Sequence, residues 1–85
     1  MAKELVLVVN AEYVGEYQIR LRFSDGVSKT VDFSRWLGGK VFHSLRDYSE
    51  FRRFFIAGGT VCWPNGADIA PETLRDAQDV ATTAA

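Results

Sequence analysis

The sequence predicts a small α+β domain, with an antiparallel sheet of about five strands built from hairpins and two short helices. The chain has 85 residues, 47% of them hydrophobic, which is enough for one core in a single domain over residues 1–85. Several stretches alternate apolar and polar residues between glycine-containing turns, as strands of hairpins do. Two other stretches, near residues 47–54 and after Pro71, have apolar residues at helical spacing.

The first two strands are expected in the N-terminal quarter of the chain. Residues 4–12 are apolar on both faces, which predicts a strand that is covered on both sides or lies at a dimer contact. Residues 16–23 alternate, with Ile19, Leu21 and Phe23 on one face and polar residues on the other. This period of two residues predicts a half-buried strand.

A three-residue loop, residues 24–26, is expected to join this strand to the next. It places Phe23 opposite Val27 and keeps one face of the hairpin apolar, whereas a two-residue loop would mix the two faces. Such a loop is a type I turn closed by a residue with positive φ, which Gly26 supplies.

The middle of the chain predicts short helical turns and a second hairpin. Ser34 is expected to cap a helical turn, and a short helix follows near residues 47–54. A Gly58-Gly59 loop then places Ile56 opposite Val61.

The segment CWPNGADIAPETL, residues 62–74, is expected to join the last strand to the last helix. Proline and Asn-Gly end the strand at residues 64–66. Pro71 suits the first helical position, and Asp68 is expected to accept backbone N–H groups at the helix start. The helix should carry apolar positions as far as Ala81, before a frayed tail at 82–85.

Composition excludes several classes of protein. Cys62 is the single cysteine, so no intramolecular disulfide can form, which is typical of a reducing compartment. No apolar run approaches the roughly 20 residues of a membrane span, and no signal-peptide cleavage site follows the N-terminal apolar run. We therefore expect a cytoplasmic protein that does not bind a membrane, with Cys62 as a buried structural thiol.

No catalytic, metal or cofactor site is expected, and no enzymatic activity. His43 is the only histidine, and it lacks the neighbouring cysteine or histidine spacing of metal sites. Phosphate-binding loops and nucleophilic serine motifs are absent from the sequence. The least favoured interpretation is a small hydrolase or nuclease that uses His43 with Asp68 or Glu72.

The net charge of −1 conceals a basic middle segment. Residues 17–53 contain eight Lys or Arg residues against four acids. The candidate basic face consists of Arg20, Arg22, Arg35, Arg52 and Arg53. Arginines interleaved with aromatic residues can bind nucleic acid, so a nucleic-acid-associated regulatory module is an alternative function. It is not favoured, because most of the aromatic residues are assigned to the core.

Four stretches together resemble a family of small bacterial domains of unknown function. They are FSDG, VDFSRWLGGKVFHSLRD, FRRF and GTVCWPNGADIAPETL, and they cover about residues 17–75, the family-like core. The positions that match the family pattern are Asp25, Gly26, Asp32, Leu45, Phe51, Trp63, Pro64, Asn65, Gly66, Asp68, Pro71, Glu72 and Leu74. One departure is Ala70, where relatives often have the helix-capping residues Asp or Ser.

The resemblance implies a non-enzymatic module that binds another protein. Some relatives are fused to a helix-turn-helix domain, and others are encoded beside small toxin-like proteins, which implies a regulatory or antitoxin-like role. This sequence shows no helix-turn-helix after residue 75, which argues against direct sequence-specific DNA binding. The candidate contact residues are Trp63, Asn65, Gly66, Asp68 and Glu72. A homo-oligomer is a second form of partnership that the sequence allows.

Overall fold

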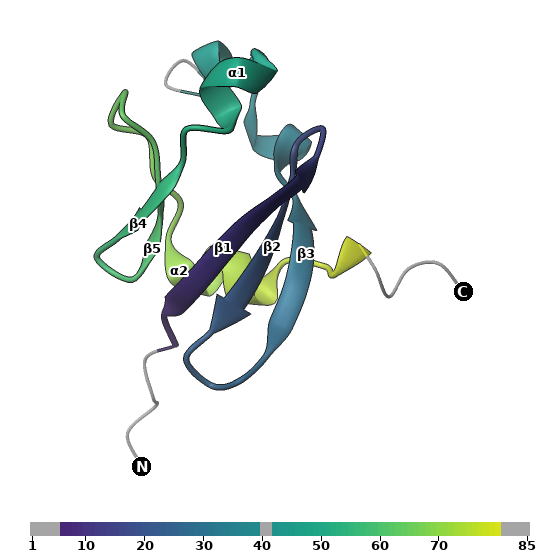
Figure 1. Ribbon diagram of the computed structural model, residues 1–85, viewed down its shortest axis with the longest axis vertical. Helices are drawn as coiled ribbons and strands as arrows, with labels where there is room; N and C mark the ends of the chain where they lie inside the picture. The colour runs from purple at the N-terminus through teal and green to yellow at the C-terminus, as the bar shows by residue number, and fades with distance from the viewer. Residues whose placement is uncertain (1–5, 40–41, 81–85) are drawn as a thin grey trace.

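The computed structural model describes residues 6–39 and 42–80. It contains two antiparallel β units around one core (Figure 1). The three-stranded sheet has the order β1-β2-β3, and β4 pairs with β5 in a separate hairpin. The strands are β1 (Val8–Gly15), β2 (Gln18–Phe23), β3 (Ser28–Asp32), β4 (Phe55–Ala57) and β5 (Thr60–Cys62). The α+β class is confirmed, and the five strands divide between two sheets.

Within residues 6–39 and 42–80, four short helical elements connect and cover the strands. They are the 3-10 helices η1 (Phe33–Trp36) and η2 (His43–Arg46) and the α-helices α1 (Tyr48–Phe51) and α2 (Pro71–Asp76). Asp32, rather than the expected Ser34, caps η1, because its carboxylate accepts the Ser34 N–H at 2.9 Å. The helix expected near residues 47–54 is only one turn, α1, which ends before the chain extends into β4.

The last helix is also shorter than expected. The backbone of Ala77 is extended, with ψ of 149°, so α2 ends at Asp76. Lys29 stabilises this end, because its ammonium donates to the carbonyls of Arg75 and Ala77. The expected position Ala81 and the expected frayed tail lie outside the described residues.

The register predicted for the β2–β3 hairpin is confirmed. Ile19 lies opposite Val31, and the N–H of Phe23 donates to the carbonyl of Val27 at 2.8 Å. Gly26 has a φ of 89°, as a three-residue loop of this kind requires. The correct register puts Ile19, Val31 and Phe23 in the core, each at most 1% exposed.

Strand β1 departs from the expectation of a strand covered on both faces. Its pairing with β2 shifts between Val8 and Asn10 and again between Tyr13 and Gly15, which marks two bulges. The extra residues, Val9 and Val14, are 54% and 47% exposed. The described chain thus covers only the face that contains Val8, and a dimer contact on β1 stays a prediction.

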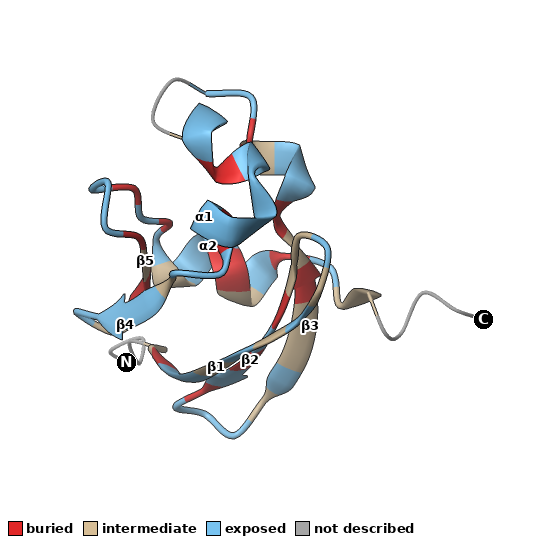
Figure 2. Ribbon diagram, turned by 45° about the horizontal axis from the view of Figure 1, so that its top comes forward, coloured by how far each residue is buried: buried red, intermediate tan, exposed pale blue. Residues whose placement is uncertain are grey.

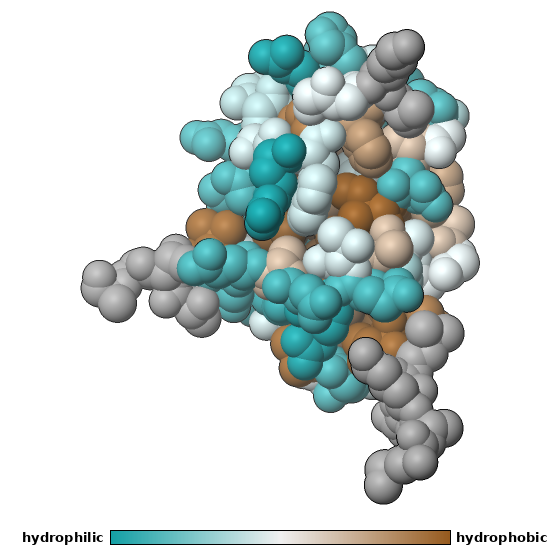
Figure 3. All heavy atoms as spheres, turned by 180° about the vertical axis from the view of Figure 1, so that it is seen from behind, coloured by the Kyte–Doolittle hydropathy of each residue, from teal (hydrophilic) through white to brown (hydrophobic). Residues whose placement is uncertain are grey.

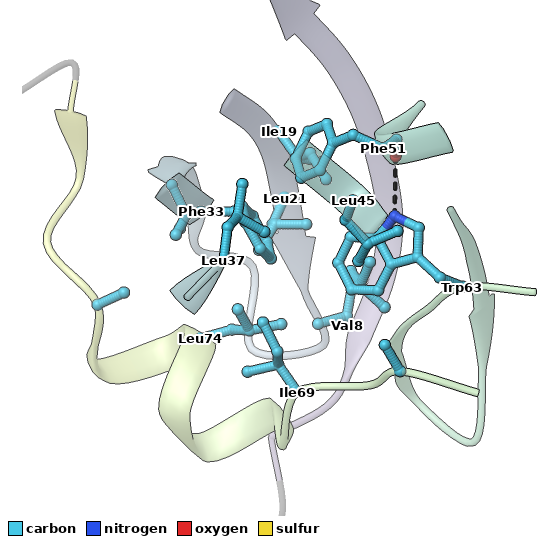
Figure 4. Close-up of a cluster of buried hydrophobic side chains, with 14 of the residues drawn as sticks. Val8, Ile19, Leu21, Phe33, Leu37, Leu45, Phe51, Trp63, Ile69 and Leu74 are labelled. Atoms are coloured by element: carbon cyan, nitrogen blue, oxygen red, sulfur yellow. Dashed lines mark hydrogen bonds between the residues drawn. The ribbon is translucent and has the colours of Figure 1, made fainter. Parts of the chain in front are cut away.

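The core lies between the sheet, the hairpin and the helices. Figure 2 shows the buried positions on the inward sides of these elements, and Figure 4 shows the buried side chains that meet between them, with Trp63 at one side of the cluster. The indole N–H of Trp63 donates to the carbonyl of Phe51 at 2.8 Å, which ties β5's end to α1. The ring of Trp63 also lies 5.9 Å from that of Phe33 and 5.8 Å from that of Phe51. Aromatic pairs at these distances add stability beyond the area that they bury.

The segment 62–74 forms a reverse turn followed by α2. The backbone N–H of Trp63 donates to the Ala67 carbonyl at 2.9 Å, and Gly66 has a φ of 92°. This repeats the pattern of the first hairpin loop, so the chain turns back at Pro64 and forms a bridge between Cys62 and Asp68. Pro71 begins α2 as predicted.

Asp68 does not cap α2, contrary to expectation. The N-cap is Ala70, and no side chain bonds the helix start there. The backbone bridge between Asp68 and Cys62 lies two residues before the cap. Asp68 therefore belongs to a short strand-like segment that precedes the start of α2.

Candidate protein-interaction surface

Three tyrosines and an arginine gather where the β1–β2 turn meets α1. Tyr13 lies on β1, Tyr17 is the second residue of the β1–β2 turn, and Tyr48 begins α1. The rings of Tyr17 and Tyr48 are 4.7 Å apart, and the guanidinium of Arg52 lies 5.7 Å from the ring centre of Tyr13. We call these four residues the tyrosine surface.

Hydrogen bonds fix the β1–β2 turn and the start of α1, the two elements that carry Tyr17 and Tyr48. The β1–β2 turn contains Glu16 at a φ of 50°, an uncommon conformation for a residue with a side chain. The Tyr17 hydroxyl donates to the carbonyl of Arg46, and the Asp47 carboxylate caps α1 through the Ser49 N–H at 2.9 Å. These bonds fix the approach of the turn to α1, and therefore the spacing of the tyrosines.

The rings of this surface are only partly covered. Tyr48 is 47% exposed, while Tyr13 and Tyr17 are half-buried against Phe51, with ring centres 6.2 and 5.4 Å from it. Partial desolvation raises the pKa of the Tyr48 phenol, and the neighbouring Tyr17, Glu16 and Tyr13 raise it further. The phenol is therefore neutral near pH 7 and can donate or accept a hydrogen bond.

A second exposed apolar feature follows α1 in the chain. In β4, Phe55 is 46% and Ile56 is 37% exposed. The hairpin is anchored to the start of β1 by a 2.8 Å bond from the Val8 N–H to the Gly59 carbonyl, and the two elements separate toward α1 (Figure 1). On the face opposite to that of Figure 1, hydrophobic residues appear in separate places between hydrophilic ones (Figure 3).

The candidate contact residues of segment 62–74 have mainly structural environments. Trp63 is 1% exposed and belongs to the core. The Asn65 side chain accepts the Ala67 N–H and donates to the Ser44 hydroxyl, both at 3.0 Å. Gly66 completes the turn, whereas Asp68 and Glu72 are exposed. The structure therefore places Trp63 in the core and leaves Asn65, Gly66, Asp68 and Glu72 exposed.

The five arginines do not form one basic face. Arg20 and Arg22 lie on the outer face of the sheet, where Glu12 pairs opposite Arg20. Tyr13 pairs with the buried Ile19 and therefore lies on the inner face of the sheet. Arg52 lies over the ring of Tyr13, so Arg52 is on the opposite side of the sheet from Arg20 and Arg22. The two remaining arginines are separate as well: Arg35 lies over Trp36, and Arg53 pairs with Glu50 at 3.6 Å.

The residues considered for catalysis are not assembled either. His43 is exposed in η2, and no hydrogen bond or ion pair joins it to Asp68 or Glu72 in the described structure. Across residues 6–39 and 42–80, no three His, Cys, Asp or Glu residues are grouped as metal ligands would be. Cys62 is half-buried rather than buried, because it lies opposite the exposed Phe55 on the outer side of the hairpin.

The tyrosine surface was not identified from the sequence. Tyr48 and Phe51 have the spacing of one helical face, which predicts that both face the core, but Phe51 is buried and Tyr48 is 47% exposed. The available signal was the pair Tyr48 and Arg52, four residues apart across a capped turn.

Within the described residues, no helix has both the length and the apolar character needed to span a membrane.

Comparison with known proteins identifies the family. The profile of the family described as Protein of unknown function (DUF2442) matches residues 8–79. No curated protein and no solved structure matches the chain. The match covers both β units, all four helical segments and the tyrosine surface. The chain therefore belongs to this family of domains of unknown function, as the motifs around Asp25 and Trp63 suggested.

Proposed function

We propose that this chain is a non-enzymatic protein-interaction module that binds another protein through the tyrosine surface. The observation that carries the proposal is the cluster of three tyrosines and Arg52 on a rigid support. Tyrosine and arginine are enriched among the residues that dominate binding energy at protein interfaces. A regulatory or antitoxin-like role is the setting that the family resemblance implies for such a module.

The physical properties of the cluster favour a protein partner. Tyrosine offers a large apolar area with few rotatable bonds, so little entropy is lost when it is covered. The neutral phenol of Tyr48 and the cation of Arg52 can both bond to backbone carbonyls or carboxylates. The carboxylate of Glu16 beside the rings adds a hydrogen-bond acceptor whose charge is opposite to that of Arg52, which would help to select the orientation of the partner.

Nucleic acid is the less favoured partner. Binding to a phosphate backbone requires several basic residues along one surface, and the arginines here are distributed over different sides of the sheet. We expect affinity for generic DNA at physiological salt no better than about 10⁻⁴ to 10⁻⁶ M. Tight binding to one sequence would contradict the protein-partner proposal.

Affinity capture with surface variants tests the proposal. The tagged chain is expressed in its native cell, and proteins that co-purify are identified by mass spectrometry and then tested in pairs with the purified chain. Tyr48→Ala should weaken binding of the partner at least tenfold, as loss of an interface hot spot does. Val9→Ala is the control, because Val9 is exposed to a similar extent but lies at the opposite end of β1 from Tyr13 and the rest of the tyrosine surface.

Both variants must melt close to the wild-type temperature, since each changes an exposed side chain. A partner that binds wild type and Tyr48→Ala equally would show that the tyrosine surface is not the binding site. Arg52→Ala provides an independent check, because it removes the cation and leaves the rings in place.

A further inference from the structure

The outer edge of β1 is protected against pairing with another strand. Two bulges, at Val9 and Val14, interrupt its regular geometry. The Asn10 side chain also accepts the Ala11 N–H at 2.9 Å, so a backbone donor that a new strand would need is already occupied. Bulges are a common protection of edge strands.

The outer edge of β3 is protected as well. The carboxylate of Asp79 accepts the Thr30 N–H at 3.0 Å, and the chain after α2 lies against this strand. Lys29 holds the same segment through the carbonyls at the end of α2. Neither edge of the three-stranded sheet is therefore open to a partner strand.

Strand β4 lacks these protections. Ala57 pairs with Thr60 across the Gly58-Gly59 turn, so in an antiparallel ladder their backbone groups bond to each other. The alternation then directs the N–H and C=O of Ile56 away from β5. No hydrogen bond to the described chain engages these two groups of Ile56. This edge also has no bulge and no proline.

The composition around β4 suits contact with an identical surface. Residues 54–67 contain no charged residue, in a chain of which 25% is charged. At a two-fold interface a residue on the axis lies opposite its own copy, so a charge at the centre of this edge would face a like charge. Phe55 and Ile56 instead offer exposed apolar side chains on the two faces of the strand.

We propose that β4 pairs in antiparallel orientation with β4 of a second copy of this chain. With Ile56 opposite Ile56 of the second copy, the free N–H and C=O of each satisfy those of the other, and the two hairpins become one four-stranded sheet. A three-residue strand gives a contact smaller than the roughly 1,000 Å² of stable interfaces. The dimer should therefore form at high protein concentration, independently of the tyrosine surface.

Cysteine cross-linking tests this arrangement even for a weak dimer. Cys62→Ser removes the native thiol, and Ile56→Cys is then introduced. The Cα atoms of a hydrogen-bonded antiparallel pair are about 5.5 Å apart, which suits a disulfide. Mild oxidation should yield a covalent dimer of Ile56→Cys, with at least fivefold less from the control Val9→Cys, whose site is at least as exposed.

Sedimentation of the chain with its native cysteine reduced supplies the second measurement. The weight-average mass should rise toward that of a dimer with concentration, and Ile56→Lys should shift this rise at least tenfold higher while the variant keeps its circular dichroism spectrum. Tyr48→Ala should dimerise as wild type does. Equal cross-linking of the two cysteine variants, or a monomer at every concentration up to about 1 mM, would overturn the proposal.

Discussion

Replacing Trp63 with phenylalanine tests how the core holds α1. The indole is 1% exposed, and its N–H donates to the Phe51 carbonyl at 2.8 Å. Phenylalanine retains an aromatic ring in the core but cannot donate this bond. The Phe51 carbonyl would lose its partner, at a cost of about 1–3 kcal/mol, and the smaller ring would leave a cavity beside Phe33.

The expected loss in the free energy of unfolding is about 2–4 kcal/mol for Trp63→Phe. An 85-residue domain has a total stability of about 4–13 kcal/mol, so this loss is a large fraction of it. Urea unfolding followed by circular dichroism measures the change without relying on tryptophan fluorescence.

Trp36→Phe is the matched control, because it makes the same substitution at a half-buried indole. Trp36 packs on Phe33 at 5.2 Å, but no hydrogen bond engages its N–H in the described structure. It should cost less than about 1.5 kcal/mol. If Trp63→Phe lost no more stability than Trp36→Phe, the bond to Phe51 would contribute nothing, and the link between the turn and α1 would be refuted.

Two further predictions concern the turns. Gly26→Ala should cost about 1 kcal/mol, because φ is 89° but an added Cβ would meet no other atom. Gly59→Ala should cost more, about 2–3 kcal/mol, because an added Cβ would lie 2.7 Å from Leu7 Cδ2. Equal urea midpoints for the two variants would contradict this order. The Val27 N–H and the Arg75 side chain lower the pKa of Asp25. The Asp25 carboxylate therefore stabilises the fold at pH values above its ordinary pKa near 3.8, and this stabilisation is lost as the pH falls through its lower pKa in the folded state. Acid titration of Asp25→Asn should therefore show a smaller fall in stability below pH 4 than wild type, and an unchanged profile would exclude this role for Asp25.

The sequence predicted those parts of the fold that depend on local pattern. The β2–β3 register followed from alternation and from Gly26, because a slip of one residue would expose the whole apolar face. The β4–β5 pairing of Ile56 with Val61 was equally accessible from the Gly-Gly turn. These signals are contained within a few residues, so no tertiary information was needed to read them.

What the sequence did not predict depends on contacts between distant segments. The end of α2 at Asp76 is supported by Lys29, which is 46 residues away from Arg75 in sequence. The exposure of Tyr48 follows from the position of Phe51 against Tyr17, not from the spacing of the two residues along α1. Helical periodicity shows that residues share a face, but it cannot show how much of that face the rest of the chain covers.

These contacts relate the Trp-Pro-Asn-Gly turn to the tyrosine surface. Trp63, directly before the turn, holds the end of α1 through the Phe51 carbonyl, and Asn65 holds η2 through the Ser44 hydroxyl. The α1 segment begins with Tyr48, and the carbonyl of Arg46 in η2 accepts the Tyr17 hydroxyl. Both elements that position the tyrosines are therefore attached to this one turn. If the proposed partner binds the tyrosine surface, a substitution in the turn that leaves the chain folded should alter binding through the geometry of that surface.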